Sequence, residues 1–86
     1  MKSLLGDDFM NNKVDIFTSS TCQYCHMAKE FFKENNVDFV EHNITTDPEA
    51  RKELVAKGYR GVPVIVINGE YILGFDKNRI SSLLGL

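Results

Sequence analysis

Residues 13–34 read KVDIFTSSTCQYCHMAKEFFKE, and this stretch decides the fold. Its first six residues include β-branched and aromatic side chains, which predict a short strand at 13–18. Polar residues at 19–21 then provide turn and helix-capping side chains, and from Gln23 onward apolar residues recur at helical spacing. The apolar face of this helix is predicted to consist of Met27, Ala28, Phe31 and Phe32. The only two cysteines of the chain, Cys22 and Cys25, fall where the strand ends and the helix begins.

The middle of the chain predicts a second strand and a second helix. Residues 37–40 (VDFV) alternate in the manner of a strand. Thr46 and Glu49 fit a capping box at the start of a helix that has Pro48 in its first turn and stops at Gly58. The positions expected to face inward from this helix are Leu54 and Val55.

The last part of the chain predicts a hairpin and a final helix. Val64–Ile67 is a continuous β-branched run, which indicates a strand buried on both faces. Asn68-Gly69 is a hairpin signal that leads to a returning strand at 71–73. Asp76 is placed to cap a last helix whose apolar side is Ile80, Leu83 and Leu84. The element order indicates an α/β fold with a parallel first pair of strands and an antiparallel edge.

Length and charge limit the classes of protein to consider. The chain has 86 residues, which is one domain; we place it at residues 13–86 and expect residues 1–12 to be a leader, either disordered or derived from an expression vector. Ten basic residues against twelve acidic ones give a net charge of −2, without the basic stripe of a nucleic-acid or membrane-surface binder. Neither a membrane span nor a signal peptide is visible. We therefore expect a cytoplasmic monomer with no nucleic-acid or membrane partner.

The three-position spacing of Cys22 and Cys25 favours reactivity over stabilisation. A bridge that closes so short a loop contributes little through chain entropy. At the start of the helix, unpaired backbone N–H groups and the positive end of the helix dipole favour a Cys22 thiolate, so we expect the pKa of this thiol to fall well below the free value of about 8.5. Cys25, one turn deeper, should keep its proton. The pattern predicts thiol–disulfide exchange with Cys22 as the nucleophile and Cys25 as the resolving thiol.

Two metal-bearing alternatives use the same cysteines. A closed zinc site needs four ligands, and the only other candidates are His26 and His42, whose spacing matches no common zinc finger. The string Cys22–His26 also fits a c-type haem attachment pattern, which requires a secreted chain. We expect no metal.

Gly61, Val62 and Pro63 immediately precede the predicted buried strand. A proline is tolerated there if it occupies the first position of the strand, where no hydrogen bond of the sheet is lost. It is also tolerated as a cis peptide bond, which would leave the backbone of Val62 free to pair with an extended substrate. The local residues favour neither interpretation over the other.

Three motifs occur in the order and spacing of one family. They are TCQYCH at Thr21–His26, GVP at Gly61–Pro63 and GFD at Gly74–Asp76. Over about residues 13–84 the chain resembles the glutaredoxins, and most of all the bacterial glutaredoxin-like redoxins with a dithiol C-x-Y-C motif. The resemblance implies a thioredoxin-like three-layer α/β/α fold with a four-stranded mixed sheet and a cis Pro63. It also implies reduction of protein disulfides or glutathione mixed disulfides, with glutathione as co-substrate.

The resemblance further assigns roles to single residues. Tyr24 would line the substrate groove, and Val62 would offer backbone hydrogen bonds to the cysteinyl part of glutathione. Phe75 and Asp76 would hold its γ-glutamyl end, where a helix N-terminus favours a carboxylate; from the residues alone, Phe75 fits a pocket and a core position equally well. The implied substrate-binding set is Tyr24, Val62, Pro63, Gly74, Phe75 and Asp76, beside the catalytic Cys22 and Cys25.

Three positions depart from the family pattern. Gln23 replaces the proline of C-P-Y-C, a position that tunes the redox potential. Ser19 stands where glutathione-using members carry a lysine that meets the glycyl carboxylate of glutathione, and Arg60 and Lys57 are the candidates to replace that cation. Leu73 stands in place of the first residue of a glycine pair, where it crowds the γ-glutamyl site.

Two alternative functions follow from these departures. The first is a redoxin that takes electrons from a thioredoxin-reductase-type flavoprotein and donates them to ribonucleotide reductase, in line with the Gly74–Asp76 motif. The second is a carrier or sensor that bridges a [2Fe–2S] cluster between two subunits through the nucleophilic cysteine and glutathione.

Overall fold

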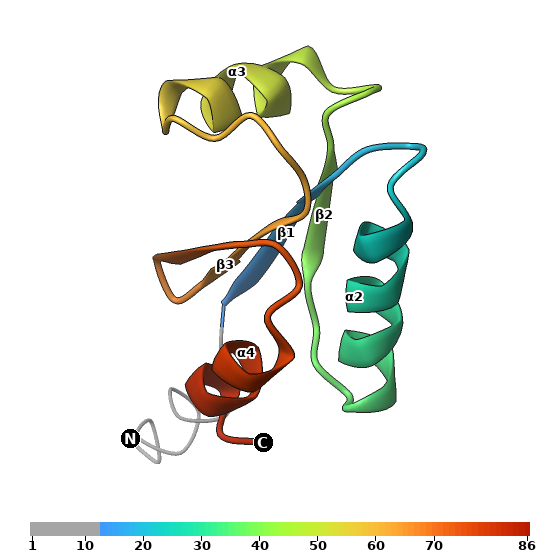
Figure 1. The fold of residues 1–86 in the computed structure, drawn as a ribbon, viewed down its shortest axis with the longest axis vertical. Coiled ribbons are helices and arrows are strands. Elements are labelled where there is room, and N and C mark those ends of the chain that lie inside the picture. The colour runs from blue at the N-terminus through green and yellow to red at the C-terminus, as the bar shows by residue number, and fades with distance from the viewer. Residues whose placement is uncertain (1–12) are drawn as a thin grey trace, which may run out of the picture.

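The computed structural model describes residues 13–86, which form four strands and three helices (Figure 1). The strands are β1 (Val14–Thr18), β2 (Val40–Asn43), β3 (Val64–Ile67) and β4 (Glu70–Leu73). The helices are α2 (Gln23–Glu34), α3 (Pro48–Ala56) and α4 (Lys77–Leu84). The expected leader at residues 1–12 lies outside the described residues. In residues 13–86, no helix combines the length and the apolar character needed to cross a membrane.

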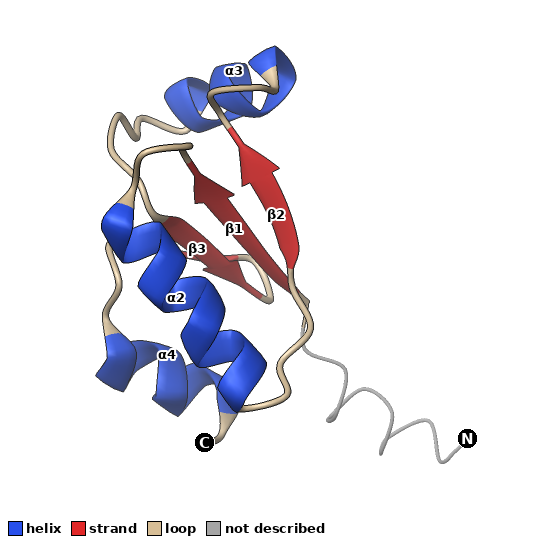
Figure 2. Ribbon diagram, turned by 90° about the vertical axis from the view of Figure 1, so that its right-hand side faces the viewer, coloured by secondary structure: helices blue, strands red, loops and turns tan. Residues whose placement is uncertain are grey.

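The strands form one mixed sheet in the order β2-β1-β3-β4. β1 is parallel to β2 and antiparallel to β3, and β3 is antiparallel to β4. Helices α2 and α4 cover one face of the sheet, whereas α3 packs on the other face, near the ends of β1 and β2 (Figure 2). The predicted three-layer α/β/α fold with a four-stranded mixed sheet is confirmed.

β3 is the centre of the core, because all four of its residues are buried and they alternate between the two faces of the sheet. The cluster on the side of α2 and α4 contains Val14, Ile16, Ala28, Phe32, Ile65, Ile67, Ile72 and Ile80. The cluster under α3 contains Phe17, Ala50, Leu54, Val64 and Val66. Val64–Ile67 is therefore apolar at every position for the predicted reason, because helices cover the sheet on both faces.

The buried faces of α2 and α3 are narrower than the apolar residues of the sequence suggested. Met27 is 46% exposed and Val55 is 53% exposed, so the predictions that place them on the inner faces are wrong. Met27 directly precedes the buried Ala28, and Val55 directly follows the buried Leu54. One position along a helix is a rotation of about 100° around its axis. A helix that packs on a sheet through one ridge buries the spacing i, i+3 and i+4 and leaves such neighbours in solvent.

The second strand begins three residues later than predicted, at Val40 instead of Val37. Helix α2 ends with Asn36 in the left-handed region at φ 56°, and the N–H of Val37 donates to the carbonyl of Phe32 at 2.8 Å. These are the bonds of a helix C-terminal motif, and they occupy the N–H of Val37. Val37 and Phe39 pack against the core without pairing, and pairing with β1 starts at Val40.

The start of α3 also differs from the predicted capping box. Asp47 is the N-cap, and its carboxylate accepts from the backbone N–H groups of Glu49 and Ala50 at 3.1 and 3.3 Å. The hydroxyl of Thr46 donates instead to the carbonyl of Asn43 at 3.4 Å. A carboxylate is a better acceptor than a hydroxyl and interacts favourably with the helix dipole, so the cap moves one residue along the chain. The predicted cap of the last helix, Asp76, is confirmed.

The outward position of Val55 has a measurable consequence. Leu54→Ala is expected to lower the free energy of unfolding by about 2–4 kcal/mol, because the side chain is 2% exposed and its removal leaves a cavity. Val55→Ala, one residue along the same helix, is expected to change it by less than about 0.5 kcal/mol. Urea unfolding followed by circular dichroism measures both, and similar losses for the two variants would contradict the orientation of α3.

Candidate active site

Cys22 is itself the N-cap of helix α2, in place of the polar side chains predicted at 19–21. Its backbone is extended (φ −87°, ψ 112°), and its Sγ accepts a hydrogen bond from the backbone N–H of Cys25 at 3.0 Å. The first N–H groups of a helix have no partner within it, and a capping acceptor satisfies one of them. Here that acceptor is a sulfur, so the helix start directs a donor and the positive end of its dipole toward Cys22.

The two cysteines form a disulfide and differ sharply in exposure. They are bonded to each other, with their Cα atoms 5.2 Å apart. Cys25 is 1% exposed and packs within the protein, whereas Cys22 is half-buried at the surface. Tyr24 lies between them in sequence and is 63% exposed, so its ring is available to a bound partner. An incoming sulfur therefore reaches Cys22 and not Cys25.

The loop that precedes Cys22 is connected to the turn after β2 by hydrogen bonds. The N–H of Cys22 donates to the carbonyl of Ser19 at 3.3 Å. The N–H of Ser20 donates to the hydroxyl of Thr45 at 3.1 Å, and the side-chain amide of Asn43 donates to the hydroxyl of Ser20 at 3.4 Å. Ser19 and Ser20 thus position the loop of residues 19–22, called the redox loop below, although they do not cap the helix.

A charged side chain on β2 holds helix α2 in place against the sheet. Glu41 accepts a hydrogen bond from Lys29 of α2 at 2.9 Å and another from the hydroxyl of Thr18 at 2.7 Å. Thr18 is 1% exposed, at the end of β1. These hydrogen bonds, that from Lys29 first, hold the pKa of the Glu41 carboxyl below its usual value of 4.5.

The sheet register brings the downstream motifs to the same end as the cysteines. Val64 pairs with Phe17, so Pro63 lies where β1 ends and the redox loop begins. Val64 also pairs with Leu73, which places Gly74 at the same end, and the N–H of Gly74 donates to the carbonyl of Pro63 at 2.8 Å. The Val62–Pro63 peptide bond is cis, as the family resemblance implied. Pro63 is buried and Val62 half-buried.

Phe75 and Asp76 both have roles in the fold. The Phe75 ring lies edge-on to that of Phe31, with centroids 5.7 Å apart, and packs on the core cluster under α2 and α4. The sequence left a pocket position and a core position open for Phe75, and the core position is the one for which the structure shows direct contacts. Asp76 caps α4 through a hydrogen bond from the N–H of Arg79 at 3.2 Å. Leu73, at the end of β4, is 62% exposed.

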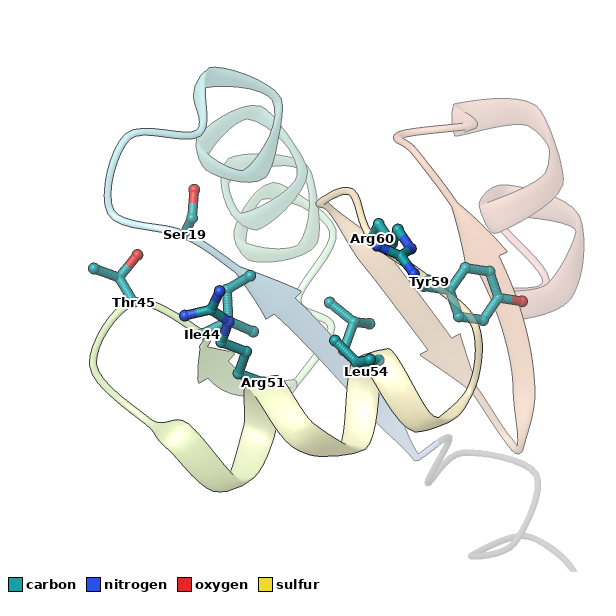
Figure 3. Close-up of a pocket in the computed structure, with 8 residues that line it drawn as sticks. Ser19, Ile44, Thr45, Arg51, Leu54, Tyr59 and Arg60 are labelled. Atoms are coloured by element: carbon teal, nitrogen blue, oxygen red, sulfur yellow. The ribbon is translucent and has the colours of Figure 1, made fainter.

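A hollow of about 480 Å³ lies beside the redox loop, between the ends of β1 and β2 and helix α3. Figure 3 shows the guanidinium of Arg51 directed from α3 toward Ile44 and Ser19, with Arg60 on the other side of Leu54. The residues that line the hollow are Ser19, Ile44, Thr45, Arg51, Leu54, Val55, Tyr59 and Arg60. The sequence indicated Arg60 as a candidate for the missing cation, whereas Arg51 was not among the predicted site residues. The signal was present, because Arg51, Leu54 and Val55 stand at i, i+3 and i+4 and so share one side of a helix.

Of the two histidines weighed as ligands, His26 follows Cys25 in α2 and is exposed, whereas His42 lies on β2. His42 contacts Asp15 through Nε2 at 3.0 Å and stacks on the ring of Phe17, on the sheet face that α3 partly covers. Within residues 13–86, no three side chains of His, Cys, Asp or Glu gather as a set of metal ligands.

Comparisons with known proteins agree with this geometry. The family model for Glutaredoxin matches residues 14–72. A glutaredoxin-like 8.6 kDa protein of the rubredoxin operon of Clostridium pasteurianum is 39% identical over 72 residues, covering 83% of this chain and 96% of that protein. The crystal structure of the thioredoxin-like protein BC3987 superposes with a TM-score of 0.78 at 33% identity, over 83% of this chain and 99% of that one. The structure of the glutaredoxin-like protein NrdH-redoxin from Escherichia coli superposes with a TM-score of 0.76 at 31% identity, over 83% of this chain and 93% of that one.

A half-buried cysteine that caps a helix, bonded to a buried partner one turn on, defines a thiol–disulfide oxidoreductase of the thioredoxin fold. Within that class the match over most of the domain is specific, and the chain belongs to the glutaredoxin family.

The unequal exposure of the cysteines predicts unequal reactivity in the reduced protein. Iodoacetamide is expected to alkylate the Cys25→Ser variant, which keeps Cys22, at least about tenfold faster than the Cys22→Ser variant, which keeps Cys25. The rate for Cys22 should reach half its maximum below the free-thiol value of about pH 8.5. Mass spectrometry of the adduct measures both rates, and equal rates would rule out Cys22 as the nucleophile.

The lowered pKa of Glu41 predicts a pH-dependent contribution to stability. A carboxyl whose folded-state pKa is depressed stabilises the fold above its unfolded value of 4.5, and this contribution is lost as the pH falls through the lower, folded value. Because the side chain is 34% exposed, we expect less than about 1 kcal/mol. Glu41→Gln should therefore flatten the fall in unfolding free energy below pH 4.5 relative to the wild type. Glu34→Gln, on the exposed end of α2, is the control, and an equal effect there would contradict the assignment.

Proposed function

We propose that this protein reduces disulfides of other proteins in the cytoplasm, as a monomer, with electrons taken from a thioredoxin-reductase-type flavoprotein. The observation that carries the proposal is the pairing of an accessible Cys22 sulfur, which accepts the N–H of Cys25, with a Cys25 that is 1% exposed. This arrangement separates an attacking thiol from a resolving thiol. It suits exchange with a disulfide that is presented on the surface of a partner.

The exchange step follows from that separation. The Cys22 thiolate attacks one sulfur of the partner disulfide, whose S–S bond breaks and releases a thiolate. Cys25 then loses its proton, attacks the Cys22 sulfur and displaces the second partner thiolate. The partner gains two electrons and, with two protons, becomes a dithiol, while Cys22 and Cys25 become the disulfide seen in the structure. The flavoprotein supplies two electrons to regenerate the dithiol.

The choice of donor is supported by two departures from the glutathione-using pattern. Ser19 removes the cation expected at the glycyl carboxylate of glutathione, and Leu73 places an exposed apolar side chain, 62% accessible, beside Gly74. The NrdH-redoxin of Escherichia coli, 31% identical, is described as having a thioredoxin-like activity profile. Ribonucleotide reductase, implied by the family resemblance, is one protein that would accept electrons in this way.

Glutathione as a co-substrate is the second candidate, and one observation favours it. Arg51 and Arg60 line the same hollow as Ser19, so cations stand next to the position that lost the lysine. A carboxylate at the hollow would meet a guanidinium there. Val62, Gly74, Phe75 and Asp76 would then take the roles that the family resemblance gives them.

A coupled assay distinguishes the two donors. One disulfide substrate, such as insulin, is reduced in the presence of NADPH and either thioredoxin reductase or glutathione with glutathione reductase. We expect NADPH consumption with the flavoprotein and at least about tenfold less with glutathione, because the glycyl carboxylate lacks its usual lysine. Turnover with glutathione alone would overturn the proposed donor.

Two cysteine variants test the order of the exchange step. Cys22→Ser is expected to reduce turnover to the background level, because it removes the attacking sulfur. Cys25→Ser should still attack the substrate but accumulate a mixed disulfide, visible as a covalent adduct by mass spectrometry. An adduct on Cys25 of the Cys22→Ser variant would contradict the assignment of the two roles.

A further inference from the structure

We propose that the hollow lined by Arg51 and Arg60 binds acidic side chains that lie next to the cysteine of the partner protein's disulfide. The inference rests on the proposed reduction of protein disulfides, and it specifies which partner surfaces this site would bind. The partner is therefore a protein segment with Asp or Glu close to its reactive cysteine.

Charge is the first argument, because these two guanidinium groups have no partner within residues 13–86. Several other charged side chains of the sheet and α2 are paired, as in the contacts of Lys29 with Glu41 at 2.9 Å and of His42 with Asp15 at 3.0 Å. Arg79 likewise pairs with Glu70 on the face covered by α4. Arg51 and Arg60 belong to none of the ion pairs found in the described residues. A guanidinium offers a planar fork of donors that matches a carboxylate, so an acidic side chain is the complementary ligand.

Position is the second argument, because the hollow adjoins both the loop that ends at Cys22 and the segment that leads to Val62. On one side it is lined by Ser19, whose carbonyl accepts the N–H of Cys22 at 3.3 Å. On the other side it is lined by Arg60, two residues before Val62. Because the hollow shares Ser19 with the loop that ends at Cys22, we expect residues close to the cysteine of the partner to be the ones that contact it.

Size and lining are the third argument. The hollow has a volume of about 480 Å³, within the range of sites that hold small ligands and larger than one Glu or Asp side chain needs. Leu54, Val55 and Tyr59 provide the apolar part of its lining. That apolar part accommodates the methylene groups and backbone of a peptide while the guanidinium groups meet its carboxylates. The site is therefore fitted to a segment of chain that carries acidic side chains.

The test uses single-turnover reduction, which needs no enzymatic donor. The full chain is reduced with dithiothreitol, desalted and mixed with an excess of a peptide containing an intramolecular disulfide. Three peptides differ only in the residues that flank the first cysteine, which are Glu, Gln or Lys. Rates are measured by stopped flow at low salt and at roughly 0.5 M salt, where screening shortens the Debye length to about 4 Å. Because no reductase is present, failure of the proposed electron donor in the coupled assay leaves this result unaffected.

We expect the Glu peptide to react about tenfold faster than the Lys peptide at low salt, and the preference to shrink at high salt. Arg51→Gln and Arg60→Gln should each reduce the preference about threefold, and the double variant should abolish it. Lys52→Gln is the matched control, because it removes the same charge from the next residue of α3, which does not line the hollow. Thermal unfolding of each variant verifies that the fold is intact.

Three outcomes would overturn the proposal. The first is equal rates for the Glu and Lys peptides with the wild-type protein. The second is a loss of preference in Lys52→Gln as large as in the arginine variants, which would indicate a diffuse field in place of a site. The third is an unchanged peptide preference in the double variant together with slower reduction of its disulfide by glutathione, which would identify the glycyl carboxylate of glutathione as the occupant.

Discussion

The hydrogen bond from the backbone N–H of Cys25 to the sulfur of Cys22 is the contact on which the site depends. Every helix start leaves N–H groups without an intrahelical acceptor, and the usual solution is an oxygen from Ser, Thr, Asp or Asn. In this chain Asp47 and Asp76 supply that oxygen for α3 and α4. At α2 the acceptor is the reactive sulfur. The structural requirement of the helix and the chemical requirement of the nucleophile are therefore met by the same atom. A Cys22 variant without an acceptor loses both, whereas Cys22→Ser keeps a capping oxygen and loses only the nucleophilic sulfur.

That contact is useful only because the sheet holds the rest of the site around it. β3 is buried on both faces and pairs with both β1 and β4, so its first residue fixes the position of Pro63 relative to the end of β1. The bond from Gly74 to the carbonyl of Pro63 then fixes the chain that leads into α4. Glu41 of β2 binds Lys29 of α2 and Thr18 of β1, so a shift of the helix that carries the cysteines breaks its hydrogen bond to Glu41. Packing around the buried strand β3 thus determines the geometry of the site at the end of the sheet.

Several features with a local cause were predictable from the sequence, although the caps of α2 and α3 were not. The extent of burial and the hollow, which depend on contacts between elements, were not predictable. The run Val64–Ile67 and the cap at Asp76 have signals within a few residues, and both are confirmed. The strand at Val37 failed because the end of α2 uses the backbone that the alternating pattern would have paired. The inward positions of Met27 and Val55 failed because periodicity locates an apolar face but not how much of it a neighbour covers. The cysteines were identified from spacing alone, whereas the hollow needs β1, β2, α3 and the segment before Val62 in place at once.

The placement of charge separates what holds this domain together from what is left for a partner. With a net charge of −2, the chain has no general attraction for acidic surfaces, so any such attraction must be local. Lys29 and Arg79 are paired with carboxylates that join neighbouring elements, and their charges are satisfied within the fold. Arg51 forms no such pair, although its helix also carries Glu49 and Glu53, and its guanidinium is directed toward the end of β2 and Ser19. Arg51 thus pairs with no carboxylate within the described residues and lines a hollow beside the loop of Cys22, which is the arrangement that the proposed acidic partner segment requires.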